Sequence, residues 1–327
     1  MFNIGSRYRA IVMRGYGQPD VLRIEQIAVL PLRPGELRMQ MITAAINHTD
    51  LKIRTGEWPI RGVSPFPYIP GVEAVGEVVE IASGLKSHQI GDKVITMMQG
   101  LAGVTAVRQG GYAEFVSGPA IAFARFDESH DGSDIAALGL AAVTAFEGLR
   151  LIGDLHGKDI VVTGAGGGVG SAAVALARAQ GARVTAIVSR PETAEYASSI
   201  GALHVLVGKM PDAASSDGVL DTVAGPLFGP CVAALRRHGT YALVGAVAGA
   251  DVTFDAWQLL SPVRLTGYSS EDLTGSELQS AIGAIAALLA NGKLRVPQKT
   301  FFKLAEAAKA HALIEGGNRH GRVLLIP

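Results

Sequence analysis

The sequence predicts an α/β protein of two domains, one rich in short strands and one built on an open parallel sheet of six strands. The chain has 327 residues, which is long for one domain and comfortable for two. Up to about residue 125 it shows short strand-like runs separated by glycine and proline turns. From about residue 133 helical and strand patterns alternate, which is typical of βαβ units.

The N-terminal part is expected to form a small, barrel-like β domain. Turn signals such as Gly15 to Pro19 and Pro31 to Gly35 separate its strands. The segment that contains His48, Arg54 and Trp58 is interpreted as a loop, although Asp50 within it suits a helix N-terminus. The expected strands are residues 9–12, 22–26, 36–45, 72–81, 93–97 and 110–116.

The second part is expected to alternate helices with six parallel strands. A long helix over residues 133–151 begins at Ser133, a good N-cap, and stops before Gly153. The six strands are residues 160–162, 183–188, 203–207, 219–223, 240–244 and 263–266, with helices at 226–237 and 276–290. The tail adds a strand at 300–303, a helix at 304–315 and a last strand at 322–326.

A glycine-dense turn follows the first of these six strands and opens a helix of small residues. Its register is Ala165-x-Gly167-x-x-Gly170, the G-x-G-x-x-G pattern with alanine in the first place. Such a turn lets the backbone approach a pyrophosphate, and the helix N-terminus attracts the anion. A second strand follows at the right distance, which favours dinucleotide binding over a merely tight turn. The residues expected to bind are Ala165, Gly166, Gly167, Gly168, Val169 and Gly170.

The end of the second strand indicates which dinucleotide is bound. NAD sites place Asp or Glu there to accept from the ribose 2′-OH. This chain has Ser189 and Arg190, with no carboxylate until Glu192. A hydroxyl followed by a guanidinium suits a 2′-phosphate, so NADPH is expected. The alternative is that Arg190 is only a solvated surface charge.

Composition excludes several functions. Lys plus Arg and Asp plus Glu are 29 each, so no net charge attracts nucleic acid or an anionic membrane. The single cysteine, Cys231, excludes intrachain disulfides and a zinc site built from cysteines, and we expect it to be a buried thiol. No signal peptide or uninterrupted membrane-spanning run is recognised, so a cytoplasmic location and no membrane partner are expected.

Motifs along nearly the whole chain give it a family resemblance. They are, in order, Asn47-His48-Thr49-Asp50, Pro70-Gly71-Val72-Glu73, Gly91-Asp92-Lys93-Val94, Gly110-Gly111-Tyr112-Ala113-Glu114, Asp221-Thr222-Val223-Ala224-Gly225 and Gly321-Arg322-Val323. The chain resembles the medium-chain dehydrogenases/reductases, in the zinc-free quinone oxidoreductase (zeta-crystallin-like) branch. The resemblance implies a GroES-like catalytic domain (residues 1–128 and 292–327) and a Rossmann domain (129–291) with a doubly wound sheet. It also implies a cleft for nicotinamide and substrate, and a homodimer joined through sheet edges.

The departures from zinc-dependent relatives predict a protein without zinc. Those relatives have cysteine at the place of Asn47 and histidine at the place of Val72. The four-cysteine lobe that binds structural zinc is also missing, since residues 96–109 contain no Cys, His, Asp or Glu. A catalytic zinc needs three protein ligands, and these positions do not supply them.

Without a Lewis acid, reduction of a quinone or of an activated C=C bond is favoured over reduction of a simple ketone. The charge then spreads into a hydroquinone or enolate anion, which hydrogen bonds can stabilise. The expected function is an NADPH-dependent quinone, enone or enoyl reductase. The alternatives are a pathway-specific reductase of a secondary-metabolite intermediate and a low-turnover, crystallin-like NADPH-binding protein.

Four residues near the first motif are candidates for the substrate site. Asn47 could donate to a substrate carbonyl, and His48 could relay a proton, as water or a cofactor ribose hydroxyl also could. Arg54 and Trp58 are expected to line the site, Trp58 as a stacking wall. Ordinary packing or turn formation is the alternative for each of them.

The resemblance implies further residues that contact the cofactor. Thr144 matches the position on the nicotinamide face, and Gly245 follows a strand at the end of the sheet where the cofactor passes. Arg322 lies near the pyrophosphate by analogy and could form a buried ion pair with Glu73. Tyr196 is placed near the 2′-phosphate, although a core position suits it equally well.

Overall fold

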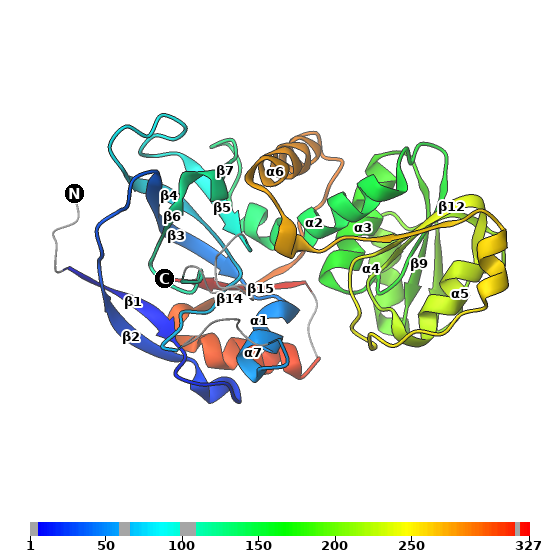
Figure 1. Ribbon diagram of the computed structural model, residues 1–327, viewed down its shortest axis with the longest axis horizontal. Coiled ribbons are helices and arrows are strands. Elements are labelled where there is room, and N and C mark those ends of the chain that lie inside the picture. Colours follow the sequence, from blue (N-terminus) through cyan, green and yellow to red (C-terminus); the bar gives the residue numbers. More distant parts are fainter. Residues whose placement is uncertain (1–5, 59–65, 99–108, 318–320) are drawn as a thin grey trace. The chain divides into compact units, whose positions relative to one another are not determined.

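The computed structural model describes residues 6–58, 66–98, 109–317 and 321–327, without the side chain of residue 272. The chain divides into two compact units (Figure 1). The first unit holds Met1–Leu140, Ser270–Ala286 and Val296–Pro327, and the second holds Ala141–Ser269 and Ala287–Arg295. The chain thus passes between units at residues 140 and 141, inside a helix, whereas the sequence predicts a boundary between 128 and 129.

The first unit contains a seven-stranded sheet with the order β14-β15-β3-β4-β5-β7, in which β6 also pairs with β3. A separate antiparallel pair is formed by β1 (Arg7–Val12) and β2 (Arg23–Ala28). The strands of the larger sheet are β3 (Glu36–Ala45), β4 (Glu73–Ile81), β5 (Lys93–Met97), β6 (Phe115–Pro119), β7 (Ala124–Arg125), β14 (Lys299–Lys303) and β15 (Arg322–Ile326). The prediction of a β-rich domain is confirmed.

One expected strand of this unit is displaced. The sequence predicts a strand over residues 110–116, but β6 begins only at Phe115. The preceding residues are used in a turn, in which Gly110 donates to Ile69 at 2.7 Å and Tyr112 donates to Pro70 at 2.9 Å. Backbone hydrogen bonds to residues 69–71 therefore replace those of a regular ladder.

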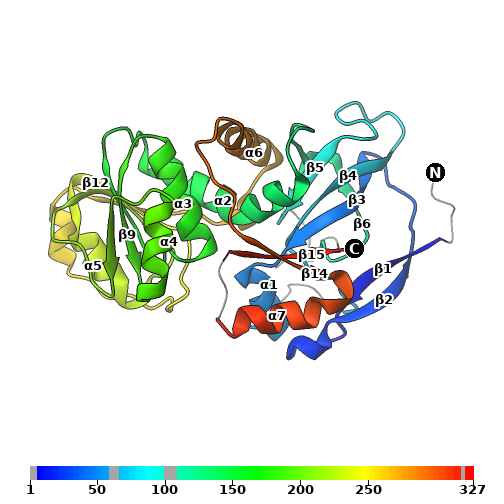
Figure 2. The same cartoon turned by 180° about the vertical axis from the view of Figure 1, so that it is seen from behind.

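Two helices of the first unit lie side by side (Figures 1 and 2), namely α1 (His48–Thr55) and α7 (Ala307–Glu315). The sequence predicts a loop where α1 lies, so that prediction is wrong. The helix begins because Asn47 has extended backbone angles and its N–H is accepted by the Asp50 carboxylate at 2.8 Å. The expected capping role of Asp50 is confirmed.

The second unit is built on a fully parallel sheet of six strands with the order β10-β9-β8-β11-β12-β13. They are β8 (Asp159–Val162), β9 (Arg183–Val188), β10 (His204–Val207), β11 (Ser216–Asp221), β12 (Leu235–Leu243) and β13 (Arg264–Gly267). The predicted doubly wound sheet is confirmed. The strand order reverses between β8 and β11, which is where such sheets bind ligands at their carboxyl ends.

The helices that precede, connect and follow these strands in the chain largely match the sequence pattern. They are α2 (Gly132–Ile152), α3 (Gly168–Ala179), α4 (Ala194–Ser199), α5 (Phe228–Ala233) and α6 (Gly275–Ala290). The prediction for residues 226–237 extends too far, because β12 already begins at Leu235. Among the described residues, one helix, α2, is long and apolar enough to cross a membrane, and 78% of its apolar window is buried within the protein.

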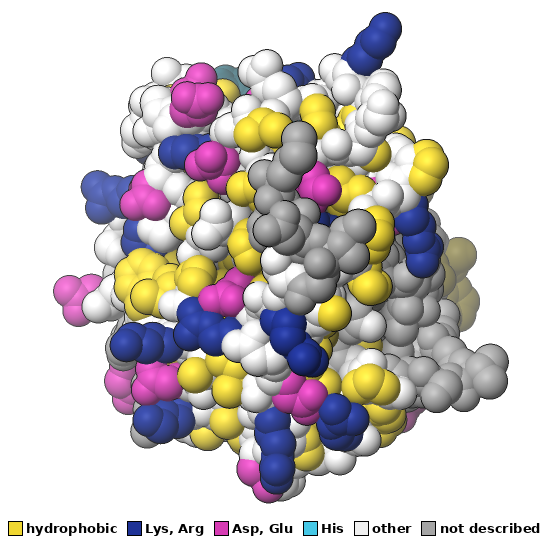
Figure 3. Space-filling view, turned by 90° about the vertical axis from the view of Figure 1, so that its left-hand side faces the viewer, with side chains coloured by type: hydrophobic (Ala, Val, Ile, Leu, Met, Phe, Trp, Pro, Cys, Tyr) yellow, Lys and Arg dark blue, Asp and Glu magenta, His cyan; other side chains and the backbone are white. Residues whose placement is uncertain are grey.

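Charged side chains of both signs are interspersed on the face of the first unit that Figure 3 shows. Acidic and basic side chains of the first unit also pair directly, as in the Arg9–Glu114 and Arg14–Glu25 ion pairs. This mixture agrees with the balanced composition of the chain.

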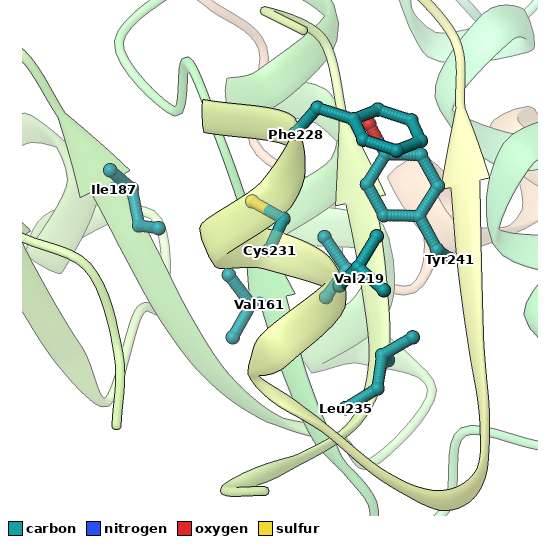
Figure 4. Close-up of a cluster of buried hydrophobic side chains, with 8 residues drawn as sticks. Val161, Ile187, Val219, Phe228, Cys231, Leu235 and Tyr241 are labelled. Atoms are coloured by element: carbon teal, nitrogen blue, oxygen red, sulfur yellow. The ribbon is translucent and has the colours of Figure 1, made fainter. Parts of the chain in front are cut away.

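A buried apolar cluster packs α5 onto the sheet of the second unit (Figure 4). The Cys231 thiol lies inside this cluster and is fully buried, and burial raises its pKa. The expectation of a buried thiol is confirmed. The members are Val161, Ile187, Val219, Phe228, Cys231, Val232, Leu235 and Tyr241.

Candidate active site

The amide of Asn47 is held between a carboxylate and a guanidinium in the first unit. Its Nδ2 donates to Glu73 Oε1 at 2.8 Å, and its Oδ1 accepts from Arg322 Nη2 at 2.8 Å. Glu73 has no donor and Arg322 has no acceptor, so these two partners fix which end of the amide is nitrogen. Asn47 comes from the start of α1, Glu73 from the start of β4 and Arg322 from the start of β15.

Glu73 and Arg322 form a buried ion pair, as the sequence analysis proposed. Their side chains are 1% and 5% exposed, and Arg322 Nη2 lies 3.3 Å from Glu73 Oε1. Burial raises the pKa of Glu73, while the guanidinium of Arg322 and the amide of Asn47 oppose this change. The Nε atom of Arg322 has no hydrogen-bond partner within the described part of the chain.

The other carboxylate oxygen of Glu73 holds the backbone of α2. Glu73 Oε2 accepts the N–H of Leu140 at 2.6 Å, next to a kink where Gly139 has φ of +38°. A Cβ atom on residue 139 would lie 2.2 Å from Glu73 Oε2. The kink therefore needs glycine, both for its backbone angles and for the close approach of the carboxylate.

The three other predicted substrate residues have different surroundings. His48 is exposed at the first position of α1. Trp58 is half-buried after the helix, and its backbone N–H donates to Lys52 O at 3.0 Å. Arg54 is fully enclosed by protein; it donates to Gly17 O at 2.8 Å and forms an ion pair with Glu315. A side chain without exposed surface does not line a substrate site, so we withdraw Arg54 from that role.

The donor set around Asn47 does not fit a catalytic zinc ion. Both ends of the Asn47 amide are engaged, and Val72 is aliphatic. Over the residues that the structure describes, no group of three His, Cys, Asp or Glu side chains could hold a metal. Most of the place of the structural-zinc lobe, residues 99–108, lies outside the described residues.

The glycine turn of the second unit, where the sequence predicts a pyrophosphate site, is tightly closed. It joins β8 to α3, with Gly167 as the helix N-cap, and Gly167 N donates to Gly164 O at 2.8 Å. Gly166 and Gly167 are exposed, whereas Ala165 and Gly170 are buried. A Cβ atom on Gly170 would lie 2.2 Å from Gly164 O, so the turn closes only with glycine there.

The residues expected near a 2′-phosphate lie beside this turn. Ser189 and Arg190 are exposed at the end of β9, and Arg190 O accepts from Thr193 Oγ1 at 2.8 Å. A Cβ atom on Gly166 would lie 3.0 Å from the Thr193 side chain, so this segment packs against the glycine turn. Tyr196 is half-buried in α4.

Two further predicted cofactor residues of this unit are on different elements. Thr144 is buried in α2, with 7% exposure. Gly245 is half-buried after β12, and a Cβ atom on it would lie 2.9 Å from Thr222 O. Gly245 thus lies next to the loop that follows β11, at the carboxyl end of the sheet.

Sequence reasoning assigned no role to Asp221, which organises that loop. Asp221 is fully buried at the end of β11 and accepts from Val223 N at 2.7 Å and Ala224 N at 3.1 Å. It also accepts from the Thr163 and Tyr241 hydroxyls, each at 2.5 Å. Since Thr163 directly precedes Gly164, Asp221 ties the loop to the glycine turn. The signal available in the sequence was a carboxylate that ends an apolar strand.

Two family models match this chain. One, described as an alcohol dehydrogenase GroES-like domain, matches residues 33–127. The other, described as a zinc-binding dehydrogenase, matches residues 200–325. Together these two matches cover more than half of the chain, in both units.

Proteins of similar sequence include dehydrogenases and reductases. The chain is 29% identical to an alcohol dehydrogenase of Geobacillus stearothermophilus, over 93% of this chain and 95% of the relative. It is 35% identical to a chloroplast envelope quinone oxidoreductase homolog of Arabidopsis thaliana, over 64% of each chain. It is 27% identical to an acryloyl-coenzyme A reductase of Metallosphaera sedula, over 97% and 99%.

Solved structures of similar fold include AibC, with a TM-score of 0.87 and 26% identity over 99% of this chain and 96% of that one. The Escherichia coli quinone oxidoreductase complexed with NADPH has a TM-score of 0.84 and 25% identity, over 98% and 100%. These likenesses extend over both units of the chain.

Proposed function

This chain belongs to the medium-chain dehydrogenase/reductase family, and we propose that it is an NADPH-dependent, zinc-independent reductase of quinones or of α,β-unsaturated carbonyl compounds. The observation that supports this proposal best is the Asn47 amide, held between Glu73 and Arg322 where zinc-dependent relatives have a metal ligand. An oxidoreductase activity follows from the family, whereas the acceptor and the cofactor are our proposal.

The second unit supports NADPH as the hydride donor. The glycine turn of residues 164–170 would hold the pyrophosphate on backbone N–H groups at the start of α3. Ser189 and Arg190 would bind the 2′-phosphate, and no carboxylate at the end of β9 would repel it. A mycobacterial protein and the Escherichia coli quinone oxidoreductase, both similar in fold, are complexed with NADPH.

Asn47 would stabilise the negative charge that develops on the acceptor oxygen. When bound, the cofactor supplies the hydride. One N–H of the Asn47 amide is used by Glu73, while the second faces Ala45 O at 3.5 Å, which is long for a hydrogen bond. This second N–H is therefore the donor that Asn47 offers to a carbonyl or quinone oxygen.

The neighbours of Asn47 would prepare it for that role. Arg322 polarises the amide through its oxygen, which makes the amide N–H groups better donors. Trp58 would form an apolar wall for a conjugated acceptor. The proton could come from water, from a cofactor ribose hydroxyl or from His48, which is exposed at the start of α1.

The proposal is tested by NADPH oxidation with purified protein and three acceptors: phenanthrenequinone, an alkenal and an enoyl thioester. Turnover with at least one acceptor, unchanged by a chelator and lowered about 100-fold by Asn47→Ala, is expected for an oxyanion donor. Turnover that requires zinc would contradict it. Activity on one bulky enone alone would instead favour a pathway-specific reductase, and tight NADPH binding without turnover a crystallin-like protein.

We also propose that the protein is a homodimer joined through β13. This strand ends the sheet of the second unit, so one of its edges has no partner strand in the described chain. Trp257 and Leu260 precede it and are 76% and 69% exposed. Light scattering should give twice the chain mass of 33.9 kDa, and Trp257→Asp with Leu260→Asp should give the monomer. A monomeric parent protein would refute the dimer.

A further inference from the structure

The Asp50 carboxylate accepts hydrogen bonds from two backbone N–H groups, and the contact between Asn47 and Glu73 depends on both. It is fully buried in the first turn of α1, where one carboxylate oxygen accepts from Asn47 N at 2.8 Å. The other oxygen accepts from Val72 N at 2.9 Å. Val72 immediately precedes Glu73, whose side chain accepts from Asn47 at 2.8 Å. One side chain, Asp50, thus holds the backbone on both sides of the contact between the Asn47 amide and the Glu73 carboxylate.

A tyrosine and a histidine lie behind Asp50, and the proposed reaction uses neither of them. The Tyr112 hydroxyl interacts with Asp50, whose pKa it lowers, and it lies 3.3 Å from His311 Nε2 on α7. Both side chains have 0% exposure, and their rings meet edge to face at 5.8 Å. The Nδ1 atom of His311 has no hydrogen-bond partner within the described residues. Three buried groups from α1, residue 112 and α7 therefore form one chain.

Burial is the main influence on the ionisation of Asp50. Burial raises the pKa of Asp50 to about 7, with a smaller contribution from Glu73, against N–H donors and the Tyr112 hydroxyl, which lower it. Burial and the nearby Arg54 guanidinium lower the pKa of His311 to about 3, so its imidazole is neutral. Tyr68 is another buried phenol that interacts with Asp50, and its hydroxyl has no hydrogen-bond partner among the residues that the structure describes.

We infer that Asp50, backed by Tyr112 and His311, is the positioning residue that fixes Asn47 against Glu73 in the proposed active site. This inference rests on the proposed function. Asp50 has no exposed surface, so it acts only through the backbone of Asn47 and Val72. Hydrogen bonds to an ionised carboxylate are roughly twice as strong as those to a neutral acid. Ionised Asp50 therefore holds the backbone of Asn47 and Val72 more firmly than neutral Asp50.

The Tyr112–His311 pair favours the ionised form of Asp50. When Asp50 is ionised, the Tyr112 hydroxyl donates toward it, and the neutral imidazole of His311 donates its Nε2 proton to Tyr112. Protonation of Asp50 adds one proton there and leaves the His311 tautomer unchanged, because Nδ1 has no partner within the described residues to take up or supply a proton. The pair therefore supports the charged form of Asp50 more than the neutral form.

Two tyrosine variants test the inference. The Tyr112 hydroxyl favours the ionised form of Asp50. Tyr112→Phe should therefore raise the pH midpoint at which Asp50 titrates by about one unit. Tyr68→Phe removes a phenol of the same kind whose hydroxyl has no partner in the described part of the chain, and it should leave the titration midpoint of Asp50 unchanged. The midpoint is measured on the side-chain amide signal of Asn47 by NMR, and in parallel on the pH profile of kcat/KM.

The two measurements separate the inference from the proposed function. The inference predicts that the Asn47 amide signal titrates near pH 7 in the parent protein, moves upward in Tyr112→Phe and ceases to titrate in Asp50→Asn. A signal that does not titrate, or an equal midpoint in the Tyr112 and Tyr68 variants, would overturn it. Absence of turnover in the parent protein would overturn the proposed function instead, because the NMR signal requires no substrate.

Discussion

The two functional regions of this protein depend on different kinds of interaction. In the first unit, Asn47, Glu73 and Arg322 depend on side-chain charge and hydrogen bonding inside a buried network. In the second unit, the turn of residues 164–170 depends on backbone shape and on the lack of Cβ atoms. The comparison teaches that the first region should fail when a charge loses its partner, and the second when any side chain is added.

The largest effect is expected from breaking the ion pair in the first unit. Arg322→Met leaves Glu73 buried beside no cation, which should lower the free energy of unfolding by about 3–5 kcal/mol. Chemical denaturation measures this loss. The double variant with Glu73→Leu removes the unpaired charge and should recover part of the lost free energy of unfolding. An Arg322→Met protein as stable as its parent would show that Glu73 is not held as an ion.

The second effect is expected from adding one methyl group to the glycine turn. Gly170→Ala places a Cβ atom 2.2 Å from Gly164 O, so the turn must open and NADPH binding should weaken roughly 100-fold, or ~2.7 kcal/mol. Binding is measured by NADPH fluorescence. Gly283→Ala is the matched control, since nothing lies within 4 Å of its added Cβ atom. Equal affinity in both variants would exclude this turn as the cofactor site.

A smaller effect is expected at the edge of the same region. Arg190→Ser should weaken NADPH about 10-fold, or ~1.4 kcal/mol, and leave NADH unchanged, because only the 2′-phosphate contact is lost. The ratio of kcat/KM for the two cofactors measures this preference. Arg183→Ser is the control, since this arginine pairs with Asp159 at the opposite end of β9. A parent protein that prefers NADH would contradict the assignment of Arg190.

The second unit was more predictable from sequence than the first because its signals are local. Six apolar runs, a glycine pattern and helix caps lie within short windows, and the strands occur where these patterns predicted them. The first unit brings together residues far apart in sequence: Tyr112 and His311 are 199 positions apart, and Asn47 and Arg322 are 275 apart. Residue types suggested Asn47 and the Glu73–Arg322 pair, but no local pattern connects Asp50 to His311.

Arg54 and α1 show how a local pattern misled the prediction. The run His48–Thr55 is short and polar, so it lacks the apolar stripe that identifies most helices. Because this run was interpreted as a loop, Arg54 was expected to line a substrate site. As a helix beside α7, it places the guanidinium against Glu315 instead. Tertiary pairing, which local propensity does not encode, decided this assignment.

Hydride delivery to the β-carbon without a metal is the step that most defines the proposed function. The direct measurement uses NADPH deuterated at the transferred position, an α,β-unsaturated ketone and enzyme treated with a chelator, with the product analysed by NMR. We predict one deuterium on the β-carbon, with a rate that the chelator leaves unchanged. Deuterium on the carbonyl carbon, or a rate that returns only when zinc is added, would contradict the proposed role of Asn47.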